Sequence, residues 1–129
     1  MVPFPPLRVR VRPGKIREPD VLFLRNEKFH LRGNRLWSGA DLVMEVVSSE
    51  PMDRHRDYQE KLAEYATAGI AEYWIVDPQR RMVTVNRLNG DHYMLHGEFS
   101  PGAEATSALL PGFSVDVTAL FGVMDELPE

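Results

Sequence analysis

The sequence predicts a single mixed α/β domain with a central β-sheet, one main helix after the third core strand, and a C-terminal β-hairpin. Three observations lead to this fold class. Three segments of strand character precede residues 54–68, where apolar side chains recur at helical spacing. An aromatic and β-branched strand follows at residues 72–76. Asn89-Gly90 then separates two alternating segments, which is the strongest short signal for a hairpin.

Size and composition are those of an ordinary globular protein. The chain has 129 residues, one domain in length, and its 43% hydrophobic and 26% charged residues exclude a disordered tail. The absence of cysteine excludes a disulfide framework, a thiolate zinc site and a cysteine nucleophile, and it fits a reducing compartment. Because no apolar run is long enough for a signal peptide or a membrane-spanning helix, we expect a cytoplasmic protein without a membrane partner.

Charge is distributed unevenly along the chain. Residues 1–35 carry nine Lys or Arg and three acids, a net charge of +6, whereas residues 36–129 carry six and sixteen, a net charge of −10. Phosphate affinity comes from Lys and Arg, so an acidic protein is not a generic DNA-coating protein. A basic segment beside an acidic body fits one surface that meets a polyanion while clustered carboxylates do other work. The alternative is an uneven surface with no such role.

Each element has its own sequence signal. Residues 7–12 alternate strictly between aliphatic residues and arginines, as in a half-buried strand. Residues 19–24 form a second strand, with proline only at its first position, and residues 26–39 are expected to be a loop or hairpin. Residues 41–47 are almost continuously apolar, which is typical of a central strand buried on both faces.

The helix and the elements after it are bounded by capping and turn residues. We expect Asp53 to be the N-cap of the helix and Gly69 to follow its end. Its apolar stripe consists of Tyr58, Leu62 and Tyr65. The hairpin strands are expected at 82–88 and 91–96, followed by a turn at 110–113 and a short helix at 116–121.

Glu45 is an anomaly in the middle of the apolar third strand. A carboxylate there costs several kcal/mol unless it is paired, neutralised or bound to a metal. Asp41 shares its face but lies about 13 Å away along the strand, too far to share an ion. Asp20 would lie opposite Glu45 if their strands are neighbours, giving an oxygen-rich site suited to Mg²⁺ or Mn²⁺. The alternative, a glutamate paired with a core arginine, remains open.

Lys61 is the second candidate. At about 100° per residue it lies about 60° from the centre of the helix stripe, so its ammonium could reach back over the end of the sheet. The alternative is an i, i+4 pair with Asp57, worth only a few tenths of a kcal/mol. From spacing alone this alternative is favoured.

Several blocks together resemble the Uma family of restriction-endonuclease-like proteins. The blocks occur in the family's order over roughly residues 7–121: Pro19-Asp20-Val21, Asp41-Leu42-Val43-Met44-Glu45-Val46, Asp57-x-x-x-Lys61-Leu62-x-x-Tyr65-x-x-x-Gly69, Glu72-Tyr73-Trp74-Ile75-Val76-Asp77-Pro78 and Leu110-Pro111-Gly112-Phe113. The resemblance implies the PD-(D/E)XK nuclease fold, which agrees with the predicted order of elements. It also implies a Mg²⁺-dependent endonuclease that hydrolyses phosphodiester bonds, with DNA as substrate.

The resemblance assigns roles to individual residues. It places the metal-binding aspartate at Asp20 and the second acid at Glu45, with the carbonyl of Val46 as a further ligand for Mg²⁺ or Mn²⁺. The lysine expected two residues after the acid is absent, because that position is Val47. The family takes its lysine from the following helix, which here is Lys61. It would orient the attacking water or offset charge on the phosphate.

Two further expectations concern partners. One face of the first strand, Arg8, Arg10 and Arg12, is expected to contact the DNA backbone without reading sequence. By comparison with the family we expect the N-terminal segment with its sheet-covering helix to be missing, and therefore expect an apolar surface near the first strand or the hairpin to form a homodimer. The rival hypothesis is a non-catalytic dimerising module with the same fold. A small-molecule-binding domain has little support, because no cofactor signature occurs.

Overall fold

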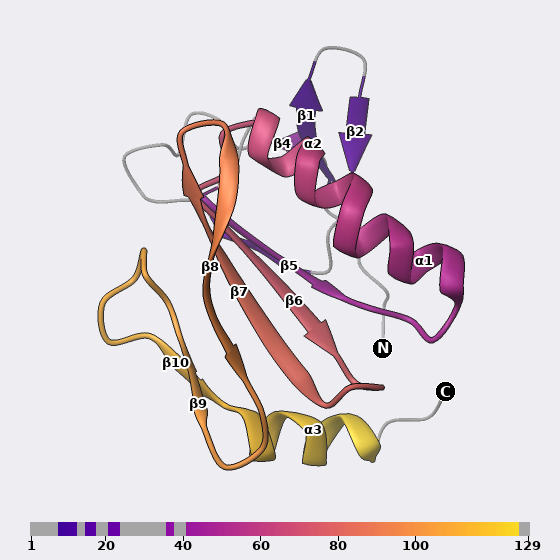
Figure 1. Ribbon diagram of the computed structural model, residues 1–129, viewed down its shortest axis with the longest axis vertical. Coiled ribbons are helices and arrows are strands. Elements are labelled where there is room, and N and C mark those ends of the chain that lie inside the picture. The colour runs from indigo at the N-terminus through magenta and orange to yellow at the C-terminus, as the bar shows by residue number, and fades with distance from the viewer. Residues whose placement is uncertain (1–7, 13–14, 18–20, 24–35, 38–40, 127–129) are drawn as a thin grey trace.

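The computed structural model describes residues 8–12, 15–17, 21–23, 36–37 and 41–126, with side chains from position 41 onward. Its centre is a mixed five-stranded sheet in the order β3-β5-β6-β7-β8 (Figure 1). These strands are β3 (Val21–Phe23), β5 (Leu42–Val46), β6 (Glu72–Asp77), β7 (Met82–Asn89) and β8 (His92–Phe99). Within this sheet, as far as the structure describes it, the β5–β6 pair is parallel and the others are antiparallel, because the main helix makes the connection between β5 and β6.

The helix expected after the third core strand is present and crosses one face of this sheet (Figure 1). It runs without a break through α1 (Pro51–His55), the wide π-helical turn η2 (Arg56–Glu60) and α2 (Lys61–Thr67). Gly69 follows its end with φ +77°, as predicted from its position. The expected N-cap Asp53 is wrong: the N-cap is Glu50, because Pro51 fits the first helical position and starts the helix earlier.

Alternation along β5 and β6 divides the core into two layers. Val43, Tyr73 and Ile75 pack under the main helix with Tyr65, which contributes the buried part of the predicted stripe. On the opposite face, Trp74 and its neighbours pack against α3 (Val117–Asp125), shown in yellow in Figure 1. The predicted terminal helix is therefore confirmed, and it is longer than expected. Its N-cap is Asp116, which accepts the amide of Ala119 at 3.1 Å.

Two smaller sheets were not predicted in full. The first strand, β1 (Arg8–Arg12), pairs with β2 (Lys15–Arg17) and with β4 (Leu36–Trp37). The other sheet joins β9 (Glu104–Thr106) to β10 (Ser114–Asp116). The predicted hairpin of β7 and β8 is confirmed, with Gly90 at φ +71° in its turn. None of the helices in the described part of the chain is long and apolar enough to span a membrane.

Candidate functional site

The candidate site begins at Glu45 on β5, whose side chain faces the main helix. Although it is charged, it is only 2% exposed. Its Oε2 lies 2.5 Å from the Nζ of Lys61 and accepts the hydroxyl of Tyr65 at 3.2 Å. The buried carboxylate is therefore stabilised by a cation and a hydrogen bond from the same helix. Among the described residues the paired cation is this lysine, and no arginine takes that place.

Lys61 joins the two alternatives that the sequence left open. Its Nζ lies 2.9 Å from Oδ1 of Asp57 as well as beside Glu45, so the inward and the i, i+4 pairings exist together. Asp57 is not a surface partner, since it is only 5% exposed. Burial by itself would lower the pKa of Lys61, but the hydrogen bonds that it donates to Glu45 and Asp57 outweigh burial and raise it. The ammonium therefore stays charged at neutral pH.

The two other predicted metal ligands differ in what the structure describes. Asp20 lies outside the described residues, so its meeting with Glu45 stays a prediction. The next residue, Val21, pairs across β3 and β5 with Met44, which directly precedes Glu45. Val46 ends β5 and is 41% exposed, so its carbonyl lies where the strand emerges from the core. Within the described ranges, no group of three or more His, Cys, Asp and Glu side chains is arranged to hold a metal ion.

The predicted DNA-contacting arginines lie on β1, of which only the backbone is described. Arg8 and Arg10 are two residues apart on the strand, as alternation requires. The pairing of β1 with β2 is irregular between Arg10 and Arg12, which interrupts the alternation there. Figure 1 shows this two-stranded ribbon beside α2, the part of the helix that carries Lys61.

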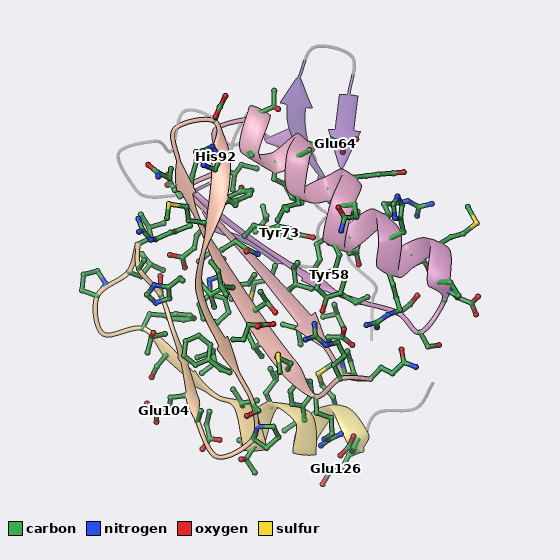
Figure 2. All side chains as sticks on the ribbon, viewed as in Figure 1. Tyr58, Glu64, Tyr73, His92, Glu104 and Glu126 are labelled. Carbon is green, nitrogen blue, oxygen red and sulfur yellow. The ribbon has the colours of Figure 1, made fainter. Side chains whose placement is uncertain are left out.

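Sequence reasoning missed three residues that surround Glu45 and Lys61. Asp57 and Tyr65 were interpreted as a surface partner and a packing residue, yet both contact the charged pair. Tyr73 lies in the core, and its hydroxyl donates to the backbone carbonyl of Asp57 at 2.8 Å. Figure 2 labels Tyr73 and Tyr58 between the long helix and the sheet. For Asp57 and Tyr65 the available signal was their spacing from Lys61, because positions 57, 61 and 65 are each four residues apart.

Another buried carboxylate, Asp77, ends β6. A turn follows this residue, and its side chain has a fixed role. The guanidinium of Arg54 donates to both of its oxygens, at 3.0 and 2.6 Å, and Tyr58 donates to Oδ2 at 2.7 Å. Despite burial, which raises it, these hydrogen bonds lower the pKa of Asp77 to about 2. This cluster therefore ties the start of the main helix to the end of β6.

A further buried carboxylate, Glu72, starts β6 on the opposite face. It accepts Trp74 Nε1 at 2.6 Å and the hydroxyl of Ser107 at 2.7 Å on one oxygen. The amides of Ala108 and Leu109 donate to its other oxygen at 2.9 and 2.8 Å. All of these donors are structural, so Glu72 holds the segment before the 110–113 turn and belongs to no reactive cluster.

The fold is that of a known nuclease-like α/β structure. The crystal structure of a putative nuclease belonging to DUF820 from Anabaena variabilis ATCC 29413 matches it with a TM-score of 0.68 and 17% sequence identity. The match covers 92% of this chain and 66% of that one, so this chain spans about two thirds of the length of the protein it resembles. A comparison with curated proteins gave no significant match.

The family follows from the sequence itself. The family model Uma2, described as "Putative restriction endonuclease", matches residues 2–118. The chain belongs to this family. The matched residues include Glu45 and Lys61, so the ion pair lies in the part of the chain that matches this family.

Proposed function

We propose that this chain is a Mg²⁺- or Mn²⁺-dependent endonuclease that hydrolyses phosphodiester bonds in DNA. The observation that carries the proposal is the Glu45–Lys61 pair, in which a buried carboxylate on a central strand meets a largely covered lysine on the main helix of a nuclease-family fold. Structural ion pairs usually lie at surfaces, because burying both charges is expensive without a compensating role. Phosphate hydrolysis requires such a combination, a carboxylate and beside it a cation that donates hydrogen bonds.

The donor set fits a hard divalent cation. Glu45 supplies carboxylate oxygens, Val46 supplies a backbone carbonyl at the end of the same strand, and Asp20 would supply a second carboxylate. Oxygen ligands of this kind suit Mg²⁺ and Mn²⁺ and do not suit softer metals. When bound, such an ion would polarise the phosphate and lower the pKa of a water molecule.

Lys61 has the remaining role in this proposal. Its ammonium stays charged, because Glu45 and Asp57 raise its pKa. A fixed cation at this place orients the attacking water or offsets negative charge that develops on the phosphate oxygens. Arg8, Arg10 and Arg12, on the ribbon beside α2, would contact the phosphate backbone and carry no sequence information.

Cleavage of supercoiled plasmid DNA with Mg²⁺ or Mn²⁺ tests this function. We expect the unmodified protein to nick or linearise the plasmid, and we expect EDTA, Glu45→Gln or Lys61→Met to abolish cleavage. Asp53→Asn is the matched control, since Asp53 is a half-exposed carboxylate on the same helix with no contact to Glu45. Cleavage that persists in Glu45→Gln would contradict the assignment of the site.

Calorimetric titration with Mn²⁺ separates the nuclease from the rival dimerising module. We expect heat from the unmodified protein, none from Glu45→Gln, and retained binding in Lys61→Met, because the affinity comes from oxygen ligands. No heat from the unmodified protein would favour a non-catalytic module.

The homodimer, expected through a surface near the first strand or the hairpin, is part of the same proposal, and we add an apolar groove elsewhere on the sheet as a candidate contact. The groove has a volume of about 150 Å³ and lies between the sheet and α3. Its lining is wholly apolar: Met44, Val46, Trp74, Val76, Val83, Val115, Leu120 and Met124. We expect light scattering at micromolar concentration to give the mass of a dimer. Met124→Glu, on α3, should dissociate this dimer, whereas the control Met52→Glu, on α1, should leave it intact. A monomeric mass for the unmodified protein would contradict the dimer.

A further inference from the structure

The turn before Lys61 departs from regular helical hydrogen bonding. In an α-helix the amide of Lys61 would donate to the carbonyl of Asp57, four residues earlier. Here it donates to the carbonyl of Arg56, five residues earlier, as in a π-helical turn. The Asp57 carbonyl instead accepts the hydroxyl of Tyr73, from β6, at 2.8 Å. A side chain from the sheet thus occupies the position that a regular helix gives to its own backbone.

The wide turn decides which way Asp57 faces. In an uninterrupted helix of about 100° per residue, positions 57 and 65 would lie about 80° apart. The additional residue in the turn brings Asp57 back to the side of Tyr65, and both are buried, at 5% and 0% exposure. Lys61 lies between them in the chain, with its ammonium 2.9 Å from Asp57 and 2.5 Å from Glu45. The wide turn therefore brings Asp57 to the place where it forms the second ion pair of Lys61.

Tyr73 is well suited to hold this turn. It is fully buried, and its backbone pairs with Val43 on β5, two residues before Glu45. Its ring packs edge-on against Tyr65, with 5.0 Å between the ring centroids. Burial, together with the nearby carboxylates of Glu45 and Asp57, raises the pKa of Tyr73, so the hydroxyl keeps its proton and remains a donor.

We propose that Tyr73 is a positioning residue for Lys61: its hydroxyl fixes the wide turn, and the turn holds Asp57 and the lysine ammonium over Glu45. The proposal rests on the proposed nuclease function for its effect on cleavage, but the position of the lysine can be measured without any activity. Tyr73 contacts neither substrate nor metal in this scheme and acts only through the helix backbone.

Tyr73→Phe removes the one oxygen that makes this bond, and Tyr93→Phe is a matched control. Tyr93 also donates its hydroxyl to a backbone carbonyl, that of Ile70, at 2.7 Å, and it packs against the same apolar cluster. Its ring lies beside that of Tyr73, with 6.1 Å between the ring centroids, but its hydroxyl bonds to Ile70 and not to the wide turn. Loss of a hydroxyl has a similar structural consequence in both variants, so any difference between them reports on the lysine.

Two readouts are compared in the unmodified protein and both variants. In ¹H–¹⁵N NMR spectra at neutral pH, the Lys61 ammonium should give a slowly exchanging signal that persists in Tyr93→Phe and is lost in Tyr73→Phe. In plasmid cleavage, Tyr73→Phe should lower kcat about tenfold or more, since small displacements of a reacting group are costly. KM for DNA and the Mn²⁺ affinity should stay within about twofold, as should kcat of Tyr93→Phe.

An unchanged ammonium signal in folded Tyr73→Phe would overturn the proposal, and so would an equal loss in both variants. If Tyr73→Phe does not fold, the unmodified protein still decides. Its Tyr73 hydroxyl proton should be slow to exchange and should show a nuclear Overhauser effect to the Lys61 amide, and absence of that contact overturns the proposal. If the unmodified protein does not cleave DNA, the proposed function fails while the NMR arm retains its meaning.

Discussion

The ammonium of Lys61 joins two buried carboxylates, lying 2.5 Å from Oε2 of Glu45 and 2.9 Å from Oδ1 of Asp57. Lys61 belongs to the main helix and Glu45 to β5, so the contact joins the helix to the central sheet. Its side chain is only 17% exposed, which limits screening by solvent. The pair is therefore part of the folded core as well as of the candidate site.

This arrangement changes the expected consequence of Lys61→Met. An exposed i, i+4 pair would contribute only a few tenths of a kcal/mol. Because the substitution leaves buried carboxylates without their cation, we expect it to lower the free energy of unfolding by about 2–4 kcal/mol. Urea denaturation of Lys61→Met, Glu45→Gln and the double variant measures this. The double variant should lose less than the sum of the two single losses, and strict additivity would contradict the coupling.

For Glu72 we predict an effect on the free energy of unfolding and none on DNA cleavage. Glu72→Gln replaces one acceptor oxygen by an amide group, which would face the donating amides of Ala108 and Leu109 or the donors Trp74 and Ser107. We expect a loss of about 2–3 kcal/mol in unfolding free energy. Below the melting temperature of the variant, plasmid cleavage should remain at the level of the unmodified protein, and a selective loss of cleavage would assign Glu72 to the site.

Much of the fold could be predicted from the sequence because its signals are local. The apolar run at 41–47 and the Asn89-Gly90 turn give β5 and the hairpin directly. The strands β2, β4, β9 and β10 have only two or three residues each, which is too few to show a periodicity in the sequence.

The candidate site was predicted in part, for physical reasons that differ by residue. Glu45 was identifiable as a charge in an apolar strand, and Lys61 from its place at the stripe edge and from the family resemblance. Asp57 was interpreted as exposed, since a helical wheel assumes a constant turn per residue and cannot contain the wide turn at 56–60. Asp77 resembled an ordinary turn residue, because the partners that bury it come from another element.

The lowered pKa of Asp77 predicts how the free energy of unfolding depends on pH. Hydrogen bonds from Arg54 and Tyr58 overcome the effect of burial and lower the pKa of this carboxylate from 3.8 to about 2. A depressed folded-state pKa adds stability that is present above pH 3.8 and is lost as the pH falls toward 2. The contribution is about 2 kcal/mol at neutral pH.

The difference in unfolding free energy between the unmodified protein and Asp77→Asn isolates this contribution. We expect it to be largest near pH 6 and to decrease by about 2 kcal/mol as the pH approaches 2. Urea titrations at several pH values measure it, with Asp91→Asn as a control, because Asp91 is an exposed carboxylate paired only with His92. A difference that does not vary with pH would show that Asp77 titrates normally.

The last prediction tests whether Asp20 belongs to the site. The chain contains no cysteine, so Asp20→Cys introduces its only thiol. A thiolate is a poor ligand for Mg²⁺ and a good one for Zn²⁺ or Cd²⁺, so the variant should lose cleavage with Mg²⁺ and recover part of it with a softer ion. Loss of Mg²⁺-dependent activity alone could arise from misfolding, whereas recovery by a particular metal requires the sulfur to contact that ion.

Two control variants complete this experiment. Asp53→Cys places a thiol on the main helix away from Glu45 and should keep its Mg²⁺ activity without any gain from Zn²⁺ or Cd²⁺. The double variant Asp20→Cys/Glu45→Gln should not recover with any ion, because both carboxylates of the proposed site are then missing. Val21 pairs with Met44 on the neighbouring strand, which is why we expect a thiol one residue earlier to meet an ion held by Glu45. If Asp20→Cys cleaves DNA with Mg²⁺ as fast as the unmodified protein, the metal is held by Glu45 without Asp20, and the two-carboxylate site is wrong.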